Sequence, residues 1–270
     1  MSELAGMSAA EMSAAFAKKE LSPVAVTQAV LDRMARLEPV LNAMYLIKAD
    51  QALASAVQSE ARWAKGRAFG PLDGVPVTVK ENIDTVGDPT PSGTAASPLD
   101  PKSVDAPQAA RLREAGCVLI GKTVMPDYGM LSSGLSSIHG VTPNPWNLER
   151  NTSGSSSGAG SAGAAGYGPL HLGTDIGGSV RLPAAHCGLF GHKPSLGRVP
   201  VAPPFLGRAT GPMTRTVSDS AMLLEVLSQP DKRDYMSLPI QPEAYADKLS
   251  KLNVKGLRIG VMTDLNAGLA

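Results

Sequence analysis

Residues 153–181 read SGSSSGAGSAGAAGYGPLHLGTDIGGSVR, and small residues dominate this stretch. Glycine and serine on this scale let one backbone segment approach another, or a ligand, closely, and glycine also tolerates positive φ. Two hydroxyl groups stand out, because Ser155 follows one glycine and Ser179 follows two. A serine behind consecutive glycines can lie within a ring of backbone N–H groups, which is what an oxyanion hole requires. The stretch therefore predicts a nucleophile and a neighbouring hydroxyl that relays its proton.

Length, composition and charge limit the classes of protein that remain. With 270 residues and 43% hydrophobic content, the chain is long and apolar enough to bury a core. The formal net charge of +1 argues against direct nucleic-acid binding, which needs a basic surface. The two cysteines show no CxxC spacing, which suits a reducing compartment and no metal site. We also expect neither a signal peptide nor a membrane span, and these features are typical of a soluble cytoplasmic protein.

Residues 1–66 predict a helical cover on a larger unit. Their apolar residues recur at helical spacing, and capping residues precede each run. The elements expected here are helices from a capping box at Ser8 to about Lys19, from Ser22–Pro23 onward and over 50–65, with a short strand over 42–47.

Residues 67–270 predict an α/β core in which strands and helices alternate. The elements expected are strands over 74–80, 118–121, 190–193 and 257–261, helices from an Asp105 cap to Ala115 and from a Ser218 cap to Leu227, and loops over 84–105 and 197–212. We therefore expect one domain overall. A further β unit begins near the end of the chain, so the core is interpreted as incomplete.

A lysine closes the first of these strands. The run 74–80 is apolar except for Thr78, and it ends at Lys80. A buried ammonium group is costly without a partner, and desolvation lowers a lysine pKa toward the working pH. A neutral amine can then activate a serine hydroxyl, which is a poor nucleophile by itself. On this residue alone, however, an ordinary surface lysine at a strand end is the simpler interpretation.

Composition and spacing leave several interpretations of the Ser/Gly stretch open. A flexible linker is one, because such segments are often rich in glycine and serine. A dinucleotide-binding fingerprint at Gly158-x-Gly160-x-x-Gly163 is another. A third is a nucleophile elbow centred on Ser156, served by a downstream histidine, as in α/β-hydrolase esterases. The last two need a preceding strand, which the sequence 147–153 does not predict.

Four motifs in residues 71–229 resemble the amidase signature family. They are PLDGVPVTVKEN at 71–82, NPWN at 144–147, GTDIGGSVRLPAA at 173–185 and GPMTRTV at 211–217. The resemblance implies a mixed twisted β-sheet with helices on both faces, and a chain longer than this one. The missing C-terminal portion would complete the sheet and much of the substrate pocket.

The family uses a Ser–Ser–Lys triad without a cofactor or a metal ion. When this triad is carried over to the matching positions of this chain, the resemblance implies that Ser179 is the nucleophile, Ser155 is the relay serine within a cis peptide, and Lys80 is the base. The resemblance further implies an oxyanion hole from the backbone N–H groups of Ile176, Gly177 and Gly178, support from Ser156, Asp175 and Arg181, and an acyl pocket lined by Met130, Leu131 and Ser132. The last three are equally well explained as core residues.

Three functions follow from the resemblance. The favoured one is an amidohydrolase that cleaves a small carboxamide through a serine acyl-enzyme. A second is the ammonia-producing glutaminase subunit of a tRNA-dependent amidotransferase, although residues 228–239 resemble stand-alone amidases more closely. A third is an incomplete domain that only binds. The expected partner is a small amide, with no nucleic acid bound directly and no membrane, while a homodimer and a need for a separate C-terminal fragment stay open.

Overall fold

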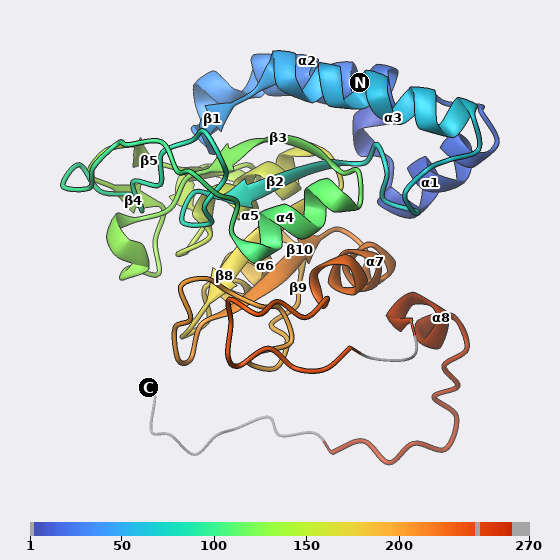
Figure 1. Ribbon diagram of the computed structural model, residues 1–270. Helices are drawn as coiled ribbons and strands as arrows, with labels where there is room; N and C mark the ends of the chain where they lie inside the picture. Colours follow the sequence, from blue (N-terminus) through green and yellow to red (C-terminus); the bar gives the residue numbers. More distant parts are fainter. Residues whose placement is uncertain (1–2, 241–243, 261–270) are drawn as a thin grey trace.

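The computed structural model describes residues 3–240 and 244–260, and its centre is a six-stranded mixed sheet (Figure 1). Strand β2 lies parallel to β3 and β8, whereas β1, β10 and β9 each run antiparallel to their neighbours. This arrangement confirms the mixed α/β sheet expected from the sequence. In spatial order the strands are β1 (Met44–Ile47), β3 (Val118–Thr123), β2 (Pro76–Lys80), β8 (Leu170–Asp175), β10 (Ala209–Thr214) and β9 (Phe190–Gly191).

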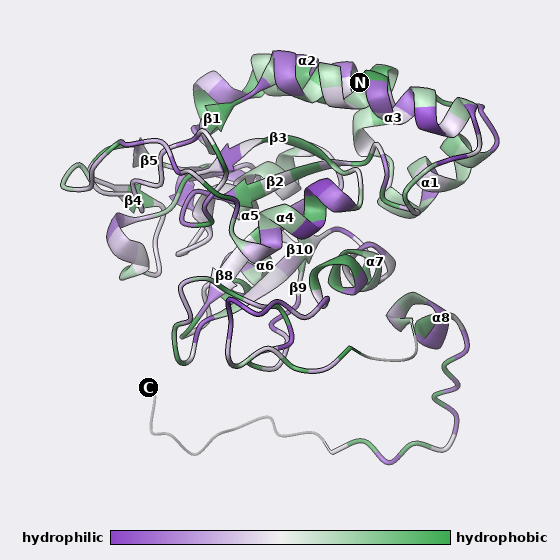
Figure 2. Cartoon of the chain, in the orientation of Figure 1, coloured by the Kyte–Doolittle hydropathy of each residue, from purple (hydrophilic) through white to green (hydrophobic). Residues whose placement is uncertain are grey.

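Helices pack against both faces of this sheet, as expected. The helical elements are η1 (Glu3–Gly6), α1 (Ala9–Ala17), α2 (Pro23–Leu41), α3 (Ala49–Ala64), α4 (Pro107–Glu114), η2 (Asp127–Gly129), α5 (Ser157–Ala165), α6 (Arg181–Cys187), α7 (Val217–Leu227) and α8 (Tyr245–Ser250). Figure 2 shows that α2 and α3 carry both hydrophilic and hydrophobic residues along their length, the pattern of helices buried on one side. No helix in the described part of the chain is long and apolar enough to cross a membrane.

Two large apolar clusters and two smaller ones fill the space between helices and sheet in the described part of the chain. On one face, Val77 and Val79 of β2 pack with Leu112 of α4 and Leu223 of α7. On the other, Ile120 of β3 packs with residues of α2 and α5. Successive side chains of a strand point to opposite faces. The two valines of β2 therefore occupy the α4/α7 face, and its remaining side chains point to the α5 face.

Several helix starts differ from their predicted positions. The capping box at Ser8 is confirmed, as is the cap at Ser22. The predicted Asp105 cap is wrong, because Asp105 instead accepts hydrogen bonds from Val86 N and Arg113 Nε, and Ala106 precedes the first turn of α4. The predicted Ser218 cap is also wrong. Thr216 caps α7, and its hydroxyl oxygen accepts the N–H of Asp219 at 3.1 Å.

The largest correction concerns strand β10, whose first four residues lie within the loop predicted over 197–212. Its Gly211 packs so tightly on the neighbouring chain segment that a Cβ would lie 2.0 Å from the carbonyl oxygen of His192. Glycine and proline weaken a strand signal in sequence, but here β10 gains pairing partners on both sides, β8 and β9.

Three further differences involve short strands. The strand expected over 190–193 is limited to β9. Residues 257–260 form no strand, and Val261 lies outside the described residues. Conversely, Asn147–Asn151 does form a strand, β7, although it pairs only with β6 (Pro143–Asn144) and all five of its residues are exposed. Because β7 lies outside the main sheet, it does not provide the buried strand that a dinucleotide fingerprint or a nucleophile elbow requires.

Candidate active site

Lys80 is fully buried at the carboxyl end of β2, on the α5 face of the sheet. The alternation along β2 places it there, since Val77 and Val79 occupy the opposite face. Its Nζ donates a hydrogen bond to Ser155 Oγ at 2.7 Å. Burial is the main cause that lowers the pKa of Lys80 to about 7, against the raising effect of nearby Glu81 and Asp175. A substantial fraction of this amine is therefore neutral near pH 7.

Ser155 lies two residues before the start of α5, and its own side chain is almost entirely buried. The peptide bond between Gly154 and Ser155 is cis, as the resemblance implies. Gly154 lies against the backbone of residues 131–133, and a Cβ at this position would lie 2.4 Å from Ser133 O. Only glycine fits this close approach. The approach brings residues 131–133 next to the hydroxyl that bonds Lys80.

Ser179 lies in the turn between β8 and α6, and its loop is held by the buried carboxylate of Asp175. That carboxylate accepts the backbone N–H groups of Gly178 at 2.8 Å and Val180 at 3.0 Å. It also accepts both Nε and Nη2 of Arg181, at 3.0 and 2.9 Å. Burial alone would raise the pKa of Asp175, but these hydrogen bonds outweigh it and lower the pKa to about 2. Asp175 is therefore ionised at neutral pH, and its bonds organise the loop.

The same bonds decide which backbone amides can face a substrate. The single hydrogen of the Gly178 N–H points to Asp175, so it is not available to a developing oxyanion. Within the described chain, the N–H groups of Ile176, Gly177 and Ser179 have no acceptor. Ile176, Gly177 and Ser179 also line the cavity that contains Ser155. These three amides are the candidates for an oxyanion hole.

Ser156 connects the two serine-bearing segments. Its backbone N–H donates to Ser179 O at 3.1 Å. Its Oγ donates to Thr174 O and accepts from Thr174 N, both at 3.3 Å. The Ser156 side chain is fully buried and is absent from the cavity lining. This position fits a supporting residue and not the exposed nucleophile of an elbow.

The histidines that an elbow would need lie elsewhere. His171 is fully buried in β8, where Nδ1 and Thr78 Oγ1 form a 2.8 Å hydrogen bond, and burial lowers its pKa to about 3. His139 bonds Glu81 at 2.9 Å. Neither these two nor His186 or His192 lines the cavity that holds Ser155 and Ser179. The geometry thus gives no histidine access to either hydroxyl.

A cavity of about 480 Å³ opens onto both hydroxyls. The predicted pocket residues Met130, Leu131 and Ser132 line it, and all three are exposed. The sequence did not single out the other lining side chains, because most of them come from loops that carry no periodic pattern. These residues are Asn82, Met125, Tyr128, Thr174, Phe205 and Arg208.

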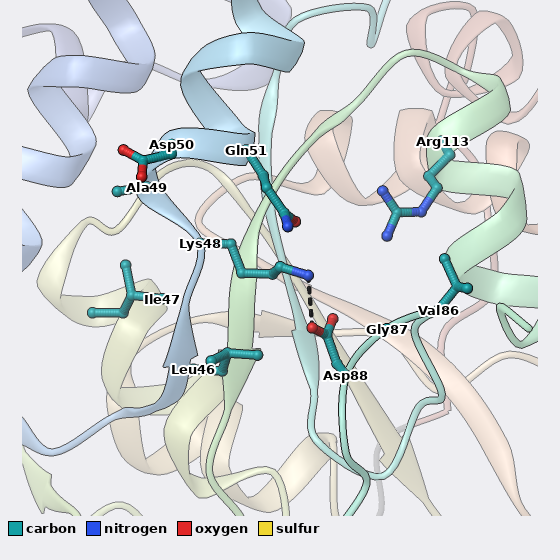
Figure 3. Close-up of a pocket in the computed structure, with 10 residues that line it drawn as sticks. All are labelled: Leu46, Ile47, Lys48, Ala49, Asp50, Gln51, Val86, Gly87, Asp88 and Arg113. Carbon is teal, nitrogen blue, oxygen red and sulfur yellow. Dashed lines mark hydrogen bonds and ion pairs between the residues drawn. The ribbon is translucent and has the colours of Figure 1, made fainter. Parts of the chain in front are cut away.

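A larger cavity, about 710 Å³, lies elsewhere, between the start of α3 and the loop after β2 (Figure 3). Both of its cationic side chains are already paired, Lys48 with Asp88 at 2.6 Å and Arg113 with Asp105 at 2.9 Å. It is lined by Leu46, Ile47, Lys48, Ala49, Asp50, Gln51, Val86, Gly87, Asp88 and Arg113, which include no serine, cysteine or histidine. Size therefore does not identify the reactive site. In the described residues no group of three or more His, Cys, Asp or Glu side chains could hold a metal ion.

The role of Asp175 gives a prediction. For the amide hydrolysis that the sequence motifs imply, Asp175→Asn should lower kcat by about 100-fold, because the carboxamide cannot accept all five hydrogen bonds and the oxyanion amides lose their alignment. Steady-state kinetics on a small carboxamide measure this effect. Asp231→Asn is the matched control, since Asp231 also pairs with an arginine, Arg233, but outside the cavity. Activity within threefold of the wild type in Asp175→Asn would contradict the prediction.

The chain matches the Amidase family model over residues 25–269, and it therefore belongs to the amidase family. It is 41% identical to one subunit of the glutamyl-tRNA(Gln) amidotransferase of Thermobifida fusca (strain YX), over 98% of this chain and 54% of that protein. It is 37% identical to an acylamidase of Rhodococcus erythropolis, over 97% of this chain and 56% of that one. The chain thus spans about half the length of these relatives.

Solved structures agree with this assignment. The native peptide amidase from Stenotrophomonas maltophilia superposes with a TM-score of 0.83 at 33% identity, over 91% of this chain and 52% of that one. The family resemblance inferred from the four sequence motifs is therefore confirmed, as is the fold class.

Proposed function

We propose that this chain carries the catalytic centre of an amidohydrolase that cleaves a carboxamide C–N bond through a serine acyl-enzyme. Neutral Lys80 accepts the proton of Ser155, which accepts the proton of Ser179. The Ser179 oxygen then attacks the amide carbonyl. The N–H groups of Ile176, Gly177 and Ser179 stabilise the oxyanion, and one such donor is typically worth about 3 to 4 kcal/mol.

The second half of the cycle uses the same groups. The leaving nitrogen takes up a proton from the Lys80–Ser155 pair and departs as ammonia or an amine, which breaks the C–N bond. Water then attacks the ester on Ser179, and the pair accepts the proton of that water. Hydrolysis releases the carboxylic acid and restores the Ser179 hydroxyl.

The observation that carries the proposal is the 2.7 Å hydrogen bond between Lys80 Nζ and Ser155 Oγ. A buried amine with a pKa of about 7 is a suitable base at neutral pH, because its neutral form is well populated there. Membership of the amidase family and the similarity to an acylamidase and a peptide amidase support the same reaction.

Labelling with a fluorophosphonate tests the proposal directly, because this reagent reports which serine is activated. We expect one label per chain, mapped to Ser179 by peptide mass analysis, and we expect prior incubation with a carboxamide substrate to slow the labelling. Absence of any labelled serine, with no ammonia or amine released from amides, would refute the proposed function. A label on Ser156 would instead support the elbow mechanism.

A second function is favoured by the relative that is 41% identical to this chain. The similarity to a glutamyl-tRNA(Gln) amidotransferase suggests a glutaminase subunit whose ammonia serves a partner. The triad chemistry would be the same. Purification of the protein from its native cells distinguishes the two functions, since a glutaminase subunit should elute in a complex with the other subunits.

A further inference from the structure

Arg208 is a cation at the candidate active site that the proposed hydrolysis does not use. It lies directly before β10, and its side chain lines the same 480 Å³ cavity as Ser155 and Ser179. Among the described residues that line this cavity, Arg208 has the sole cationic side chain, and none has a carboxylate.

Most hydrogen-bond donors of Arg208 have no acceptor. A guanidinium group offers five N–H donors. Within the described chain, Nη2 donates to Pro203 O at 3.3 Å, whereas Nε is buried without any partner. No carboxylate of a described residue lies within ion-pair distance, and Asp84, whose charge acts on Arg208, lies 4.0 Å from the ammonium group of Lys102. Nη1 also has no acceptor within the described chain and, unlike Nε, it is not enclosed, so a ligand in the cavity that accepts its hydrogen bonds would bind favourably.

The surroundings of Arg208 favour a planar anion. The guanidinium carbon lies 5.3 Å from the centre of the Phe205 ring, which is a cation–π contact. The planar fork of an arginine matches the two oxygens of a carboxylate. Elsewhere in the cavity lining, Asn82 donates to Thr174 Oγ1 at 3.1 Å, while its buried Oδ1 accepts nothing within the described chain. The cavity thus offers guanidinium donors for an anion, while the enclosed Asn82 Oδ1 is not accessible to a substrate.

We propose that Arg208 binds a carboxylate of the substrate, so that the site selects amides that also carry an ionised carboxyl group. This inference rests on the proposed function of the same cavity. The cavity volume suits such a small molecule, since ligand pockets typically measure about 300–1,000 Å³. Arg208 is a specificity-determining residue in this proposal, because it contacts the substrate away from the scissile bond.

Binding to a Ser179→Ala protein tests the inference without depending on turnover. The two ligands are succinamate and levulinamide, which have the same chain length and differ in that a methyl ketone replaces the carboxylate. We expect calorimetric titration to show succinamate binding about 30-fold more tightly, as a charge-assisted pair requires. Adding Arg208→Met should reduce this affinity ratio to about 1. Arg208→Lys should give an intermediate ratio, because the charge remains and the fork is lost.

Arg198→Met is the matched control. Arg198 donates to Pro239 O at 2.7 Å and does not line the cavity, so this variant should keep the 30-fold ratio. Equal affinity for the two ligands, or an unchanged ratio in Arg208→Met, would overturn the inference. If Arg208→Met fails to fold, the ratio of the two affinities, measured on the parent protein and on Arg208→Lys, still tests whether Arg208 binds the carboxylate.

The outcomes also separate this inference from the proposed function. Preference for succinamate in a protein that hydrolyses no amide would support the role of Arg208 and refute the hydrolysis. Hydrolysis of both amides, with equal binding affinities for the two, would support the proposed hydrolysis and refute the role of Arg208.

Discussion

Ser179→Ala is expected to lower kcat for amide hydrolysis by about 10,000-fold or more, the range found when a serine nucleophile is removed. The reason is that alanine offers no oxygen to form the acyl-enzyme, and the neighbouring Ser155 hydroxyl is hydrogen-bonded to Lys80 and nearly buried. KM should change little, because the cavity keeps its shape. Rapid-quench measurement of ammonia release separates the chemical step from binding. The burst of acyl-enzyme formation should also disappear.

Two other serines of the same stretch provide controls for this result. Ser157→Ala removes a hydroxyl that donates to Val124 O at 3.4 Å, outside the cavity, and should retain most of the activity. Ser156→Ala should reduce activity less than Ser179→Ala, since Ser156 only fixes the backbone near Thr174. The nucleophile assignment fails if Ser156→Ala, or a single substitution of His139, His171, His186 or His192, is as inactive as Ser179→Ala while the fold is retained.

Much of the sheet could be predicted from sequence because its signals are local. The run 74–80 places three valines on one face, and this alternation sends Lys80 to the other face. The helices before residue 66 were predictable for the same reason, since capping and periodicity act within one or two turns. The contact between Lys80 and Ser155 joins residues 75 positions apart, and only the family resemblance linked them.

The features that could not be predicted depend on neighbours that are distant in the chain. Strand β10 contains glycine and proline, and it is a strand because β8 and β9 flank it. The amide of Gly178 looked free in the motif, but the folded loop turns it toward Asp175. Arg208 and Asn82 reach one cavity from segments over 100 residues apart; Arg208 lies outside the four motifs, and the motif that ends at Asn82 does not predict that the two residues meet.

The second large effect is expected for Lys80→Met, which should lower kcat by about 10,000-fold because no other base among the described residues bonds Ser155. Methionine fills a similar buried volume without a charge, so the fold should survive.

The folded pKa of Lys80, about 7, lies below the ordinary 10.5, so between these pH values the unfolded chain binds more protons than the folded one. Stability of the parent protein should therefore rise with pH across that window, and Lys80→Met should lose this part of the rise. Chemical denaturation at several pH values measures how the free energy of unfolding changes with pH in the parent protein and in Lys80→Met.

The pH profile of activity distinguishes a base from a merely structural lysine. Since Lys80 must be neutral to accept a proton, kcat/KM of the parent protein should increase tenfold per pH unit below about pH 7 and level off above it. Lys80→Arg should be inactive at every pH, because arginine stays protonated. Lys122→Met is the matched control: Lys122 is also fully buried, burial lowers its pKa to about 8, and it donates to Pro89 O outside the cavity. If Lys122→Met abolishes activity as fully as Lys80→Met, or if Lys80→Met keeps more than a tenth of it, the relay through Ser155 is not the route by which Ser179 loses its proton.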